Sequence, residues 1–127
     1  MECKRENRTR PGWGAGITTD TVTHFLIDVL PQLAAELASQ LRAQGEDSLA
    51  DSVPGLCIVD RCRCGDEFCA TFYTEPRPKG AYRPSHRNVV LEPAEGMLSL
   101  DVVDDRIACV EVLYRPAIRS RVLELVP

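Results

Sequence analysis

Apolar residues recur every three or four positions between residues 17 and 44, which is the spacing of an amphipathic helix. Asp20 is the predicted N-cap, with Thr19 as the alternative, and Gly45 is the predicted stop. Pro31 interrupts the pattern, because it cannot donate a backbone hydrogen bond and its ring crowds the preceding turn. We expect one long helix kinked at Pro31 rather than a second helix beginning there, since the apolar face keeps its phase across the proline. That face comprises Val22, Phe25, Leu26, Val29, Leu30, Leu33, Leu37 and Leu41.

From residue 56 onward the apolar period shortens, and short segments rich in β-branched and aromatic residues follow one another. The dipeptides Gly65-Asp66 and Asp104-Asp105 suit two-residue hairpin turns. We therefore expect an antiparallel meander of about five strands. The expected strands cover 56–64, 68–74, 87–92, 97–104 and 106–114.

The last predicted hairpin has apolar residues on both of its faces. Leu98, Leu100 and Val102 share one face, which should take the long helix. Met97 and Val103 lie on the other face, which should take the C-terminal segment or a second subunit.

A short amphipathic helix is expected near the C-terminus, because Pro116 suits a first turn and Ile118, Val122 and Leu125 follow at helical spacing. The predicted fold class is α+β: a long N-terminal helix packed on the antiparallel meander sheet, followed by the short C-terminal helix. Residues 1–16 lack apolar periodicity, so we expect a flexible basic arm there and a single α+β domain over 17–127.

Length and charge narrow the classes of function. The 127 residues suit one domain, and a net charge of −4 disfavours a generally basic nucleic-acid binder. No apolar run is long enough to cross a membrane, and the N-terminus does not resemble a secretory signal. We therefore expect a cytoplasmic protein without a membrane partner.

Three of the six cysteines, Cys62, Cys64 and Cys69, form one cluster in the first predicted hairpin. A turn at Gly65-Asp66 pairs Cys62 with Cys69, whereas a turn at Asp66-Glu67 pairs Cys64 with Cys69. In either register all three sulfurs project from one face, because residues two apart on a strand share a face.

Such a trio could hold zinc, with His86, His24 or a water as the fourth ligand. It could also form a reversible disulfide, but a reducing compartment favours free thiols. The spacing is not the usual one of structural zinc sites, so we expect no cofactor and interpret the trio as reduced cysteines buried under the long helix.

The connection over residues 74–88 is the second candidate site. Prolines keep it extended, and its basic side chains surround an aromatic residue and a histidine, which is a pattern that can bind a phosphate or an acidic protein surface. A solvated loop without a binding role is the alternative. The predicted partner-binding residues are Arg77, Lys79, Tyr82, Arg83, His86 and Arg87.

Catalytic residues are hard to find in this chain. A Cys69–His86 dyad is conceivable, but its members lie on separate predicted elements. We expect a small, acidic, non-enzymatic protein that binds a protein partner, with a second copy of the chain as one candidate. In composition it is similar to bacterial immunity or accessory proteins that occlude a partner, a resemblance of class without a shared motif. The alternatives are a zinc- or thiol-dependent regulatory module and, after it, a Cys–His enzyme.

Overall fold

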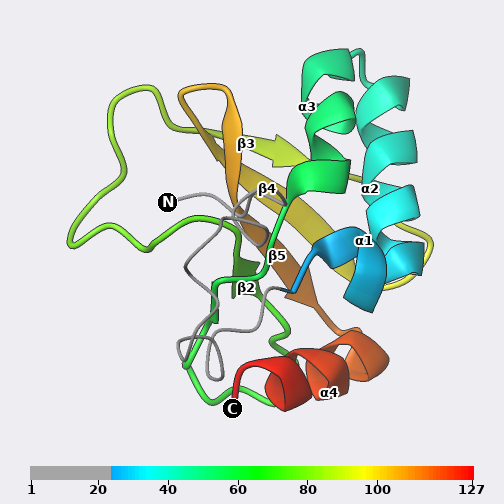
Figure 1. The fold of residues 1–127 in the computed structure, drawn as a ribbon, viewed down its shortest axis with the longest axis vertical. Coiled ribbons are helices and arrows are strands. Elements are labelled where there is room, and N and C mark those ends of the chain that lie inside the picture. Colours follow the sequence, from blue (N-terminus) through cyan, green and yellow to red (C-terminus); the bar gives the residue numbers. More distant parts are fainter. Residues whose placement is uncertain (1–23) are drawn as a thin grey trace, which may run out of the picture.

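Helices cover one face of a five-stranded antiparallel sheet in the computed structural model, which describes residues 24–127. Figure 1 shows this arrangement, and it confirms the predicted α+β class. The predicted basic arm and the predicted cap at Asp20 or Thr19 lie outside the described residues.

The first helical segment is divided at Pro31. Helix α1 covers Leu26–Val29 and helix α2 covers Pro31–Ala43, so the expectation of one kinked helix is wrong. Leu30 leaves the helical conformation, with φ −138° and ψ 64°. A proline cannot donate to the preceding turn but suits a first helical turn, and α2 therefore starts afresh there.

Two short helical segments connect α2 to the sheet. Helix α2 ends before Gly45, whose φ of +81° is the left-handed conformation that terminates helices. Helix α3 (Asp47–Ser52) and the 3₁₀ turn η2 (Val53–Gly55) then lead to the first strand.

The strands pair in the order β1-β2-β5-β4-β3, so the expected meander is wrong although all neighbours are antiparallel. Strand β5 is buried along most of its length and therefore takes a central place, while the long connection after β2 carries the chain to the far edge. The strands are β1 (Asp60–Arg61), β2 (Phe72–Tyr73), β3 (Arg87–Val90), β4 (Met97–Val103) and β5 (Arg106–Leu113).

The two predicted hairpin turns have different outcomes. The pairing of Asp60 with Tyr73 has the register of the Asp66-Glu67 alternative. The turn itself lies one residue further along, because the N–H of Cys69 donates to the carbonyl of Asp66 at 3.2 Å, which puts Glu67-Phe68 at its centre. The predicted turn at Asp104-Asp105 is confirmed, since φ is positive at both residues (53° and 61°), as a type I′ turn requires.

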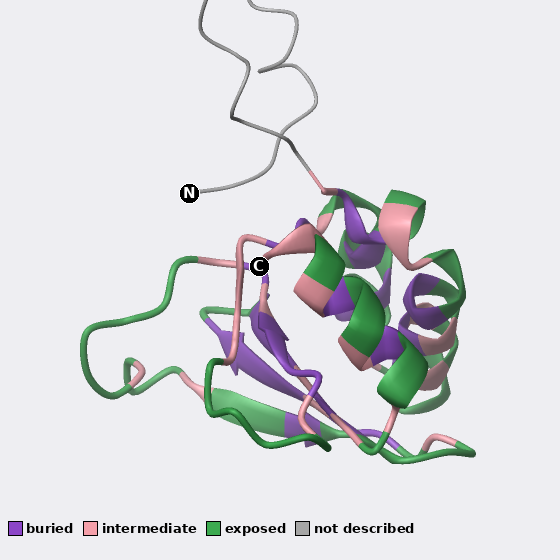
Figure 2. Ribbon diagram, turned by 90° about the horizontal axis from the view of Figure 1, so that it is seen from below, coloured by how far each residue is buried: buried purple, intermediate pink, exposed green. Residues whose placement is uncertain are grey.

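The core lies between the sheet and the helices. Leu98, Leu100 and Val102 are buried there as expected, together with Ile118 and Val122 of the C-terminal helix α4 (Pro116–Leu125). Helix α4 thus joins the same core as α2, and it does not cover the second face of the sheet as one expectation had it. Figure 2 shows the helices gathered on one side of the strands. None of the helices within residues 24–127 is long and apolar enough to span a bilayer.

Candidate functional site

The hairpin between β1 and β2 carries its cysteines on the face of the sheet that the helices leave uncovered. Phe72 is 0% exposed and points into the core, so its neighbours Thr71 and Tyr73 point the opposite way. Cys62 lies opposite Thr71, whose carbonyl accepts its N–H at 2.9 Å. Cys69, two residues before Thr71, shares that outward face.

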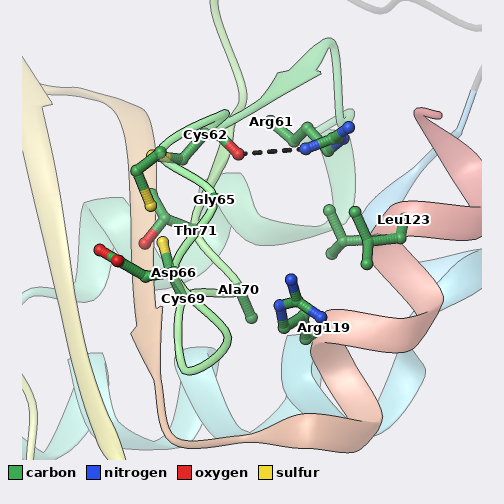
Figure 3. Close-up of a pocket in the computed structure, with 11 residues that line it drawn as sticks. Arg61, Cys62, Gly65, Asp66, Cys69, Ala70, Thr71, Arg119 and Leu123 are labelled. Atoms are coloured by element: carbon green, nitrogen blue, oxygen red, sulfur yellow. Dashed lines mark hydrogen bonds between the residues drawn. The ribbon is translucent and has the colours of Figure 1, made fainter.

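The sulfur atoms of Cys62, Cys64 and Cys69 lie within 4.8 Å of one another. Figure 3 shows Cys62 and Cys69 on the same side of the hairpin. Sulfurs around a tetrahedral zinc are about 3.8 Å apart, given a Zn–S distance of about 2.3 Å. Small side-chain rotations would therefore close this trio around one ion.

The expectation that these cysteines fill the core is wrong. Cys64 is exposed, and Cys62 and Cys69 are only half-buried, because the helices cover the other face. Cys109 is buried in β5, but it pairs with Asp101 and lies on the uncovered face of the sheet rather than in the core under the helices. Cys57 is buried as well, but it is disulfide-bonded, so the expectation of free thiols fails at that position.

The three thiols affect one another's ionisation. A backbone N–H of Asp66 favours the Cys64 thiolate, but the thiols of Cys62 and Cys69 outweigh it and raise the pKa of Cys64 to about 11. Burial acts to raise the pKa of Cys69, yet hydrogen bonds from Thr71 and the neighbouring thiols hold it below its ordinary value. Thiolate character is thus concentrated on Cys69, because three close thiolates would repel one another.

The predicted fourth ligand is not at the cluster. Nε2 of His86 lies 2.8 Å from Oδ1 of Asp101, and within the described part of the chain the ligand group consists of the three cysteines alone. The structure therefore does not assemble the Cys69–His86 dyad. His24 does not join the group either.

A groove of about 360 Å³ runs from the cysteines across the open face of the sheet. Cys62 and Cys69 form one end, beside Asp66. The other walls come from the sheet and from the long connection: Tyr73, Tyr82, Asp101, Cys109 and Glu111 are among them.

A pair of carboxyl groups lies in this groove, and sequence reasoning missed it. Burial acts to raise the pKa of Asp101, but hydrogen bonds from Glu111, His86 and Asn88 outweigh it and lower that pKa. The hydrogen bond to Asp101, together with burial, raises the pKa of Glu111 to about 7. Below about pH 7 Glu111 therefore mostly holds a proton, which it donates to ionised Asp101.

The alternation of side chains along β4 and β5 could have predicted this pair of carboxyl groups. Ser99 pairs with Glu111 and Asp101 pairs with Cys109, so the two carboxyl groups are diagonal neighbours on one face. Sequence analysis placed Asp101 with the turn residues Asp104 and Asp105 instead.

The basic connection folds back on the molecule, and most of its predicted binding residues contact the protein itself. The Arg77 guanidinium lies 4.9 Å from the centroid of the Tyr73 ring, and Tyr82 contacts the ring of His86. Arg83 and Arg87 form ion pairs, the former with Asp104 and the latter with Glu46. Lys79 is exposed. Their role in binding a partner stays a prediction.

Comparison with known proteins finds no match among protein-family models, curated proteins or solved structures.

Proposed function

We propose that this chain is a zinc-binding module whose ligands are Cys62, Cys64 and Cys69. The observation that carries the proposal is the mutual separation of their sulfurs, within 4.8 Å on one face of one hairpin. This geometry favours the zinc alternative over the interpretation as core cysteines.

The chemistry of the trio suits a soft divalent or monovalent cation. Thiolates select zinc and copper(I) over magnesium or calcium, which prefer oxygen ligands. A bound cation also removes the mutual repulsion that otherwise limits ionisation of neighbouring thiols. The three thiolates provide this selectivity without a histidine or carboxylate ligand.

Metal binding would stabilise the edge of the sheet at β1, which few backbone hydrogen bonds hold. Strand β1 has only two residues, so few backbone hydrogen bonds hold this edge. The hairpin also contacts the end of the chain, because Nε of Arg61 donates to the carbonyl of Val126 at 2.6 Å. Binding energy at the sulfurs would therefore contribute to the folding of the hairpin and to its contact with the C-terminus.

Zinc titration of the reduced, full-length protein against a chromophoric chelator tests the proposal. We expect one zinc per chain in the wild type and at least about a tenfold loss of affinity in Cys64→Ser, because one of three thiolates is removed. Cys109→Ser is the matched control, since Cys109 is a free cysteine outside the trio. Absence of stoichiometric zinc, or an equal loss in both variants, would contradict it.

The protein partner expected from the sequence remains a second proposal. Two residues of the uncovered sheet face favour it, since Val90 is 66% and Met97 57% exposed. In this proposal the module is non-enzymatic and binds its partner, or a second copy of itself, through this face, as an occluding accessory or immunity protein does. A partner retained by the wild type and lost with Val90→Ser/Met97→Ser supports it, and equal retention contradicts it.

A further inference from the structure

The metal site would be incomplete with protein ligands alone. A structural zinc site is closed by four protein ligands, whereas a site with three keeps one position open. Among residues 24–127 the group supplies only three ligand atoms, and His86 is held by Asp101. Asp66 lies beside the cysteines but outside the group of close ligand atoms.

All three cysteines border a space of about 30 Å³ beside α4, and Cys62 and Cys69 also border the groove on the uncovered face of the sheet. The smaller space has room for no more than a water, so a larger ligand at the open position would come from the groove. Cys62 and Cys69 are walls of that groove, so an ion held between their sulfurs lies at its end. The volume of about 360 Å³ is enough for a small organic molecule next to the ion. A ligand that reaches the metal from the groove therefore also meets the groove's other walls.

Those other walls are complementary to a cation. Asp101 is 7% exposed and ionised, with Glu111 hydrogen-bonded to it. The phenol rings of Tyr73 and Tyr82 line the space between. The carboxylate attracts an ammonium group and would repel a carboxylate ligand. The metal end, in contrast, prefers a soft donor such as sulfur.

We infer that the metal keeps an exchangeable fourth position, taken by the sulfur of a small aminothiol whose ammonium group faces Asp101 and Glu111. This inference rests on the proposed metal site. On binding, the thiol loses its proton to solvent and its sulfur donates an electron pair to the ion in place of water. No bond within the protein is made or broken.

Cobalt(II) bound to the reduced, full-length protein provides the readout, because its visible absorption reports the ligands and their geometry. Three probes of similar size are added: cysteamine, 2-mercaptoethanol and 3-mercaptopropionate. We expect each to change the spectrum, with cysteamine saturating at a concentration about tenfold below that of 3-mercaptopropionate.

Two variants separate the contributions. Asp101→Asn removes the negative charge of the carboxyl pair, so it should take up cobalt like the wild type but reduce the preference for cysteamine, and this comparison cancels the intrinsic differences among the thiols. Asp66→Asn should change neither the uptake of cobalt nor the preference for cysteamine, because Asp66 is not the fourth ligand.

The outcomes are distinct. Failure to bind cobalt or zinc at all overturns the proposed function and this inference with it. Binding of the metal with a spectrum that no thiol alters leaves the proposed function standing and overturns the open position. Equal saturation by all three probes, or a preference unchanged in Asp101→Asn, overturns the assignment of an aminothiol.

Discussion

Nε2 of His86 lies 2.8 Å from Oδ1 of Asp101, and this contact ties the long basic connection to the middle of β4. Asn88 donates to the same oxygen at 2.6 Å. The ring of His86 in turn contacts Tyr82, which brings this tyrosine to the wall of the groove. One buried carboxylate therefore positions both the connection and one side of the candidate ligand site.

Replacing His86 with alanine should release the connection without unfolding the domain. Between the end of β2 and the start of β3, trypsin can cleave only after Lys79, because Arg77 and Arg83 each precede a proline. We expect His86→Ala to be cut faster at this bond than the wild type, because loss of a local contact raises the population of open states. Mass spectrometry of a tryptic time course measures it. The double variant His86→Ala/Lys79→Gln is the control and should not be cut at this bond. If His86→Ala and the wild type are cut at the same rate, His86 does not hold the connection in place.

Glu111 should make stability fall as pH rises. Its pKa is about 7 in the folded protein, above the value of about 4.3 for an unfolded chain, so the native state binds the proton more tightly. The stabilisation is present below about pH 4 and is lost between about pH 4.5 and pH 7. After allowance for the solvent-exposed part of the carboxyl group, the loss should be on the order of 1–2 kcal/mol.

Urea unfolding of the wild type and Glu111→Gln across this range checks the slope. The variant should lack most of the decline, because glutamine does not titrate. Glu92→Gln, at an exposed position, serves as the control and should keep it. Parallel pH profiles for the wild type and Glu111→Gln would show that the carboxyl pair does not share a proton.

Gly96 should tolerate no side chain. Its φ is +71°, and an added Cβ would overlap the backbone oxygen of Leu113 and the side chain of Arg115. Gly45 has a similar φ of +81° but nothing within 4 Å, so it isolates the backbone cost. We expect Gly45→Ala to cost about 1 kcal/mol and Gly96→Ala at least about 2 kcal/mol more, measured by thermal unfolding. An equal loss of stability in the two variants would mean that the backbone at Leu113 and the side chain of Arg115 move aside at little energetic cost.

Cysteine replacements in the metal-free protein should distinguish a buried cysteine from an exposed one. Cys109→Ala should cost about 1–2 kcal/mol, because it leaves a small cavity in a buried strand. Cys64→Ala should change stability by less than about 0.5 kcal/mol, since Cys64 is exposed. Chemical denaturation in the presence of chelator measures both. A larger cost at Cys64 would restore the interpretation of this cluster as core.

The elements that depend on local patterns were predictable from the sequence. Period-two runs located the strands, Gly45 marked the end of α2, and Pro116 begins α4 as predicted. The strand order was not predictable, because it depends on which strand buries most surface across long separations in the chain. The alternation of side chains along a strand predicts that the three sulfurs share one face of the sheet, but it does not predict which face the helices cover. The face that the helices cover determines whether these cysteines are buried in the core or lie at an accessible site.

The strand order also determines how this sheet can associate with other chains. The longest strands, β4 and β5, lie inside the sheet, while the edges are the two-residue β1 and the four-residue β3. Pro93 closely follows β3 and has no N–H to extend its ladder. Short edges of this kind offer an incoming strand few backbone groups to pair with, which protects against edge-to-edge aggregation. A chain that associates with this sheet would therefore meet side chains on the open face rather than a strand edge, and substitutions there can change such a contact without altering the backbone pairing of the sheet.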